Sequence, residues 1–122
     1  MSNFLRRCFN STAASRDLRA FLDLEALKGK TPVLGKEWTA PQLRLKSWED
    51  LHKLWFVLLK ERQMLQSEFL RYKSLGEQAP AGERYRAVKK SMCRIKSVLT
   101  ERALAESDPA KKEELKRRIN AL

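Results

Sequence analysis

Two amphipathic stretches separated by a loop constrain the fold of this chain more than any other feature. Residues 74–82 contain Gly76, Pro80 and Gly82, and this composition predicts a loop. The stretches on either side repeat apolar residues at intervals of three and four, as helices that bury one face do. The sequence therefore predicts an all-α fold built on a long antiparallel two-helix hairpin. The first stripe comprises Trp48, Leu51, Trp55, Leu58, Leu65, Phe69 and Tyr72, and the second, in a helix over about 83–105, comprises Tyr85, Val88, Met92, Ile95 and Leu99.

The first long helix begins at Ser47, whose hydroxyl can accept an N–H of the first turn, with Asp50 completing a pattern like a capping box. Arg62 interrupts its apolar stripe, whereas Phe56 and Val57 broaden it beyond one face. A helix that is apolar over more than one face must pack on two neighbours. We expect one to be the second helix and the other to be the N-terminal segment or a partner protein.

Residues 16–46 are predicted to form a short N-terminal helix and an extended connector. The helix would cover about 16–27, with Ser15 as its cap and Gly29 at its end. Trp38 lies in the connector, where we expect it to plug the hairpin; base stacking is the alternative.

The C-terminal extension, residues 106–122, is predicted to contain a short helix over about 109–120. Asp108 is its expected cap, and Pro109 suits its first turn. Glu113 and Glu114 precede arginines by four residues, so its charges can pair locally. Because its apolar stripe is thin, the helix is expected to be mobile or docked at the periphery.

Charge points to an anionic partner. The chain of 122 residues carries 26 Lys and Arg against 15 Asp and Glu, a formal net charge of +11. RNA, DNA and an anionic membrane surface are the candidates. Between positions 84 and 102 there are seven basic residues and one acidic residue, Glu101. A solvated helix usually interleaves both signs, so this loading favours phosphate contact.

Catalysis, cofactors and metals are not expected. His52 is the only histidine, and Cys8 and Cys93 have no metal-like spacing, so both cysteines are read as reduced and structural. There is no Gly-rich phosphate loop or nucleophile motif. No apolar run approaches the roughly 20 residues of a membrane span. Residues 1–15 are rich in Arg and Ser and contain no acid, which predicts a mitochondrial presequence or, alternatively, a basic tail that touches RNA.

Two motifs resemble the universal large-subunit ribosomal proteins of the "L twenty-nine" family. The lead-in Leu43-Arg44-Leu45-Lys46-Ser47 is similar to the segment before helix one in bacterial members. Their helix-two signature appears here as Val88-Lys89-Lys90-Ser91-Met92-Cys93-Arg94-Ile95. Met92 and Cys93 depart mildly from that pattern, and Cys93 is expected to be a small core residue. Within the family, residues 43–65, with Trp48, Trp55 and Lys60-Glu61-Arg62, look like the mitochondrial branch, also called large-subunit protein forty-seven, as do Trp38 and the Arg16–Leu22 element.

The resemblance covers about residues 16–105 and implies a structural, non-enzymatic component of the mitochondrial large ribosomal subunit in the matrix. It further implies binding to large-subunit rRNA near the polypeptide exit tunnel, beside the "L twenty-three" family protein. The competing interpretations are a non-ribosomal helical adaptor or assembly factor in mitochondria, and an amphipathic protein on an anionic membrane surface. The side chains predicted to bind RNA, all in or next to the hairpin of residues 47–105, are Arg44, Lys46, Lys60, Arg62, Arg86, Lys89, Lys90, Arg94 and Lys96.

Overall fold

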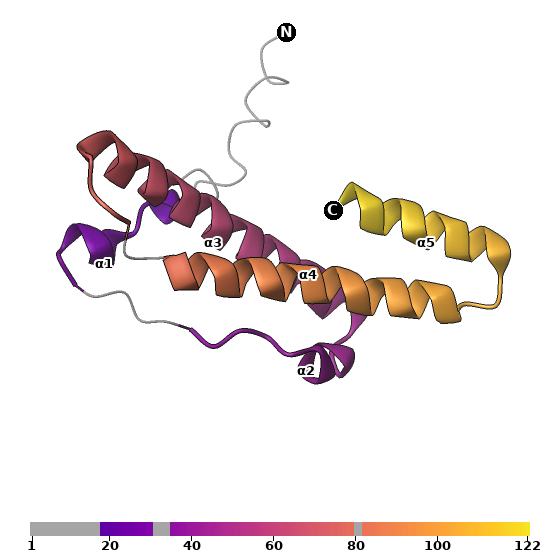
Figure 1. The fold of residues 1–122 in the computed structure, drawn as a ribbon. Helices are drawn as coiled ribbons and strands as arrows, with labels where there is room; N and C mark the ends of the chain where they lie inside the picture. Colours follow the sequence, from indigo (N-terminus) through magenta and orange to yellow (C-terminus); the bar gives the residue numbers. More distant parts are fainter. Residues whose placement is uncertain (1–17, 31–34, 80–81) are drawn as a thin grey trace, which may run out of the picture.

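The computed structural model describes residues 18–30, 35–79 and 82–122, and every regular element in them is a helix (Figure 1). The predicted all-α fold is therefore confirmed. The predictions for residues 1–15, and for Ser15 as a cap, lie outside the described residues. The elements in chain order are η2 (Leu18–Phe21), α1 (Leu24–Leu27), α2 (Ala40–Arg44), α3 (Trp48–Leu75), α4 (Gly82–Ala105) and α5 (Pro109–Ala121).

The two long helices, α3 and α4, form the predicted antiparallel hairpin (Figure 1). Helix α3 begins as expected, because Ser47 Oγ accepts a hydrogen bond from the Asp50 N–H at 3.2 Å. It ends at Gly76, whose φ of 75° is a conformation that glycine adopts without strain. The two helices share one core, which confirms the seam read from the sequence. Its buried members include Leu51, Trp55, Leu58 and Leu65 of α3 and Val88, Met92, Ile95 and Leu99 of α4.

The N-terminal region departs from the prediction of one helix over about 16–27. Asp23 separates η2 from α1 and caps α1: its Oδ1 accepts the N–H groups of Glu25 and Ala26, both at 3.1 Å. The prediction was wrong because the carboxylate starts a new helix at this point instead of continuing an existing one. Gly29, with φ of 71°, follows α1 as predicted.

The connector is not extended throughout, because α2 lies within it. The Thr39 N–H donates to Gln42 Oε1 at 3.2 Å, and Pro41 occupies the first turn of α2. The Thr-x-x-Gln spacing with an early Pro is a helix-start signal that the sequence reading missed. Before α2, the connector is fastened to α4 by the Trp38 N–H, which donates to Ser91 Oγ at 3.1 Å. Trp38 also packs against the core, as the plug interpretation required.

Helix α5 is docked, not detached. Asp108 Oδ1 accepts the Ala110 N–H at 3.0 Å, which confirms the predicted cap. The helix folds back along α4 (Figure 1), where Ile119 is buried and Leu115 and Leu122 pack on the hairpin core. Its thin apolar stripe is therefore enough to hold it at the periphery.

Cys93 is exposed, so its predicted place in the core is wrong. At 100° per residue, it follows Met92 around α4 and leaves the seam that Met92, Ile95 and Leu99 share. Met64 and Glu68 of α3 are buried although neither belonged to the predicted stripe, and Phe69, which did, is exposed.

Candidate nucleic-acid interface

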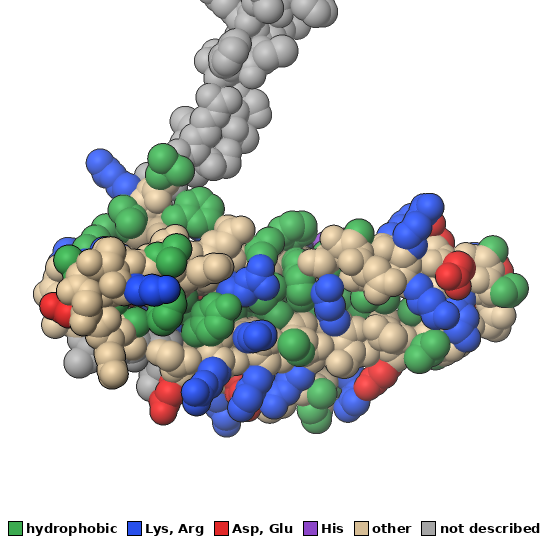
Figure 2. Space-filling view, turned by 45° about the horizontal axis from the view of Figure 1, so that its top comes forward, with side chains coloured by type: hydrophobic (Ala, Val, Ile, Leu, Met, Phe, Trp, Pro, Cys, Tyr) green, Lys and Arg blue, Asp and Glu red, His purple; other side chains and the backbone are tan. Residues whose placement is uncertain are grey.

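The outward face of α4 gathers four of the predicted RNA-binding side chains. Arg86, Lys89, Lys90 and Arg94, together with Cys93, line a shallow hollow of about 390 Å³. Figure 2 shows Lys and Arg side chains along one long edge of the molecule, with a few acidic side chains between them. The helix places these cations together because positions three and four apart share a face.

Two of these four cations, Lys90 and Arg94, form ion pairs with Glu37 of the connector. Glu37 lies 3.7 Å from Lys90 Nζ and 3.3 Å from Arg94 Nη2. Arg94 Nη1 also donates to the Trp38 carbonyl at 2.8 Å. Arg94 therefore fastens the connector to α4, a role that its outward position on a helical wheel did not indicate.

The lead-in to α3 is held from α4 in a similar way. Arg44 makes a two-pronged ion pair with Glu101, with both nitrogen–oxygen distances at 3.0 Å. This pairing raises the pKa of Arg44 and lowers that of Glu101, chiefly through the hydrogen bonds between them. Arg102 Nη2 donates to the carbonyls of Arg44 and Lys46, at 3.0 and 2.6 Å. The Lys46 ammonium lies 4.9 Å from the centre of the Trp38 ring.

The remaining predicted side chains have no carboxylate partner among the described residues. Lys60 and Lys96 lie over aromatic rings, at 5.9 Å from the Phe21 centre and 5.3 Å from the Trp55 centre. The side chains of Arg62, Arg86 and Lys89 make no hydrogen bond or ion pair with any described residue. The structure thus brings Arg86, Lys89, Lys90 and Arg94 to one hollow, whereas Lys60 and Arg62 lie on α3 outside it.

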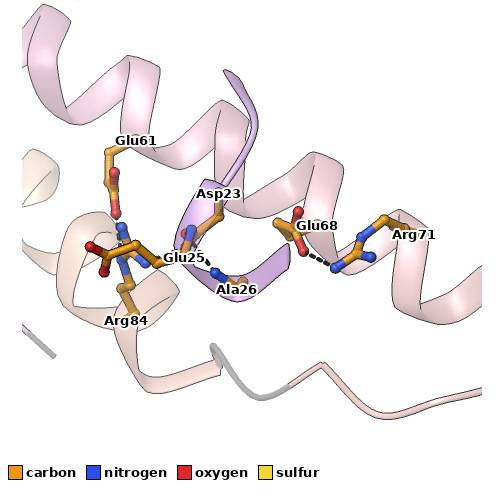
Figure 3. Close-up of polar contacts among 7 residues, drawn as sticks. All are labelled: Asp23, Glu25, Ala26, Glu61, Glu68, Arg71 and Arg84. Atoms are coloured by element: carbon orange, nitrogen blue, oxygen red, sulfur yellow. Dashed lines mark hydrogen bonds and ion pairs between the residues drawn. The ribbon is translucent and has the colours of Figure 1, made fainter. Parts of the chain in front are cut away.

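Arg84 is a structural cation that the sequence reading did not single out (Figure 3). Its Nε donates to Glu61 Oε1 at 2.6 Å, and its Nη1 donates to Asp23 Oδ2 at 2.8 Å, so it joins α4, α3 and the start of α1. Burial alone would raise the pKa of Asp23. Hydrogen bonds from Ala26, Arg84 and Glu25 outweigh it and hold that pKa below its ordinary value. The only sequence signal was the place of Arg84 beside the seam.

The described residues contain no group of three or more His, Cys, Asp and Glu side chains that could hold a metal ion. No helix among them is both long and apolar enough to cross a membrane. The described structure presents a helical hairpin with a shared core, and α4 carries a cationic face.

Fold and surface together define a class: a small, basic, all-α protein organised around a helical hairpin. The chain belongs to the family described as mitochondrial 39-S ribosomal protein L47 (MRP-L47), which matches residues 18–102. It is 50% identical over 80 residues to "Large ribosomal subunit protein uL29m" of Neurospora crassa, covering 63% of this chain and 30% of that protein. The protein of the same name from Chaetomium globosum is 47% identical over 81 residues, covering 63% of this chain and 29% of the relative.

The chain spans less than a third of the length of these relatives. The matched residues contain the connector that is fastened to α4 and almost all of the hairpin, whereas α5 lies beyond them. The resemblance to the mitochondrial branch, which residues 43–65, Trp38 and the Arg16–Leu22 element predicted, is therefore confirmed at the level of the family.

Proposed function

We propose that the chain is a structural, non-enzymatic constituent of the mitochondrial large ribosomal subunit and supports translation in the matrix. Its family membership, over residues 18–102, carries this proposal. The proposed partners are large-subunit rRNA and neighbouring ribosomal proteins. The "L twenty-three" family protein and a position near the polypeptide exit tunnel belong to the proposal through the resemblance described above.

The hairpin would act as a rigid clip on folded rRNA. Its shared core fixes the separation of α3 and α4, and α4 presents the cationic hollow outward. Double-stranded RNA hides its base edges in a narrow major groove, so phosphate contacts and shape should dominate over base reading along helical rRNA. The proposed phosphate contacts are the six predicted cations that have no carboxylate partner among the described residues, which are Lys46, Lys60, Arg62, Arg86, Lys89 and Lys96. Arg44, Lys90 and Arg94 would contribute mainly by fastening the connector and lead-in.

Sedimentation of the tagged protein from mitochondrial lysate tests the proposal directly. We expect the protein to migrate with the large ribosomal subunit, and to leave that fraction after RNase treatment. Migration at low mass in both cases would refute the ribosomal role and favour the non-ribosomal adaptor or assembly factor.

A matched pair of variants tests the hollow. The double variant Arg86→Glu/Lys89→Glu should lose RNA affinity and subunit incorporation while keeping its helical circular dichroism. Lys28→Glu/Lys30→Glu, which makes the same change in net charge on exposed residues after α1, is the control. For the intact chain, six phosphate contacts predict a slope of log K against log salt of about −4 to −5.5. A slope near zero, or equal losses in both variants, would contradict a localised phosphate-binding face.

A further inference from the structure

An apolar pocket lies at the loop end of the hairpin, between α1, α3 and α4. Its volume is about 420 Å³, within the usual range for small-ligand sites of about 300–1,000 Å³. Leu65, Phe69 and Tyr72 of α3 line it together with Tyr85 of α4 and Ala26 of α1. Three of these five lining residues, Phe69, Tyr72 and Tyr85, are aromatic. Such a pocket suits a flat ring that can be enclosed between aromatic faces.

One wall of this pocket is a buried carboxylate. The Glu68 side chain is only 6% exposed, and its Oε2 accepts a hydrogen bond from Arg71 Nη2 at 2.9 Å (Figure 3). No hydrogen bond from a described residue reaches Glu68 Oε1. An ionised carboxylate can only accept hydrogen bonds, so a ligand that meets it must bring an N–H or O–H donor. An exocyclic amino group of a nucleobase is such a donor.

Arg86 connects the apolar pocket to the cationic hollow. It lines both sites, the pocket with the aromatic residues and the hollow with Lys89 and Lys90. Its guanidinium makes no hydrogen bond or ion pair with a described residue. A ligand that fills the pocket therefore leaves its next chemical group beside Arg86. In a nucleotide, the ribose joins the base to an anionic phosphate, which can then reach Arg86.

We propose that this pocket binds one unpaired base of an RNA, while Arg86 and Lys89 hold the adjoining phosphate. The inference rests on the proposed function and deepens it, because it assigns a base-binding site next to a phosphate-binding face. Unpaired bases in folded RNA are commonly recognised by stacking on aromatic rings, with hydrogen bonds to their edges. An apolar side chain of a partner protein could also enter the pocket. It would use neither the free guanidinium nor the acceptor oxygen, so the charges favour the nucleotide.

The test compares two RNAs on the full chain. One is a single-stranded oligouridylate that carries one 2-aminopurine, and the other is an abasic ribose-phosphate chain of equal length. We expect the base-containing RNA to bind more tightly, by about fivefold to a hundredfold for one stacked base. We also expect the fluorescence of 2-aminopurine to be quenched on binding. Equal affinity for the two RNAs would overturn the base site, and salt-dependent binding of both would leave the phosphate-binding proposal intact. Failure to bind either RNA would refute both.

A matched aromatic pair on α3 localises the effect. Phe69 lines the pocket and is 56% exposed, whereas Phe56, on the same helix, does not line it and is 58% exposed. Phe69→Ala should abolish the preference for the base-containing RNA and the quenching, and Phe56→Ala should preserve both. Phe69→Leu, which keeps apolar area without a ring, should behave like Phe69→Ala. The base site would be refuted if both alanine variants behave alike. It would also be refuted if Phe69→Ala impairs subunit incorporation with RNA binding unchanged, which would assign the pocket to a protein partner.

Discussion

Removal of the Arg84 side chain should detach the N-terminal elements from the hairpin. α1 has only four residues, and an isolated helix of that length has no stability of its own. Arg84 holds it through Asp23 Oδ2 at 2.8 Å and reaches α3 through Glu61 Oε1 at 2.6 Å. Arg84→Met keeps most of the apolar stem and deletes both ion pairs, so it isolates the guanidinium.

The magnitude follows from the burial of the three partners. The side chains of Arg84, Asp23 and Glu61 are 21%, 11% and 27% exposed. An exposed pair contributes about 0.2–1 kcal/mol, whereas removing one partner of a buried pair costs about 3–5 kcal/mol. The cluster lies between these limits, so we expect Arg84→Met to lower the free energy of unfolding by about 2 kcal/mol.

A double-mutant cycle with Asp23→Asn separates the ion pair from the helix cap. Asn keeps an oxygen that can accept the Glu25 and Ala26 N–H groups, so the substitution mainly removes charge. We expect a coupling energy of about 1 kcal/mol between positions 23 and 84, measured by urea unfolding monitored by circular dichroism. Coupling below about 0.3 kcal/mol, with α1 still protected from proteolysis in Arg84→Met, would refute the anchoring role.

Three further predictions concern stability. Leu99→Ala, at a fully buried seam position, should destabilise the protein by about 3 kcal/mol in urea unfolding, whereas Leu104→Ala on the exposed side of α4 should change it by less than about 0.5 kcal/mol. Arg102→Gln should cost about 1–2 kcal/mol and speed tryptic cleavage at the lead-in, since the Arg44 and Lys46 carbonyls lose a shared donor. An unchanged cleavage rate would contradict that role. Because the folded-state pKa of Asp23 is lowered, the native state binds fewer protons than the unfolded state, so this contribution is present above about pH 4 and is lost as pH falls below it. Asp23→Asn should make the thermal midpoint less dependent on pH in that range, and an unaltered acid profile would count against this assignment.

The fold was largely predictable from periodicity and helix boundaries. The spacing of Leu51, Trp55, Ile95 and Leu99 fixes which faces of the long helices meet, and Ser47 and Asp108 mark helix starts by local hydrogen bonds. Such signals lie within a few residues of the feature they produce. The same locality explains the errors around Asp23 and Thr39, where short-range capping overrides the apparent pattern of a longer helix or an extended connector.

The candidate site was less predictable because charge alone does not say what a cation contacts. On a helical wheel Arg86 and Arg94 look equivalent, yet only Arg94 meets the connector, at the Trp38 carbonyl. That contact joins positions 56 residues apart in the chain and depends on where the connector runs. The apolar pocket has the same origin: Ala26, Phe69 and Tyr85 become neighbours only in the folded molecule.

Arginine and lysine side chains play different parts in holding the segments of the molecule together. Among the described residues, the hydrogen bonds through which a basic side chain joins separate segments are all donated by arginine: Arg44, Arg84, Arg94 and Arg102. Acetylation neutralises lysine and leaves the guanidinium group of arginine charged. Acetylated protein should therefore keep the arginine hydrogen bonds that hold its connector and lead-in and, of the ion pairs there, lose only the 3.7 Å pair of Lys90 with Glu37. Its outward face should lose much of its attraction for phosphate. Covalent modification of lysine could in this way lower the RNA affinity of the hairpin without unfolding it.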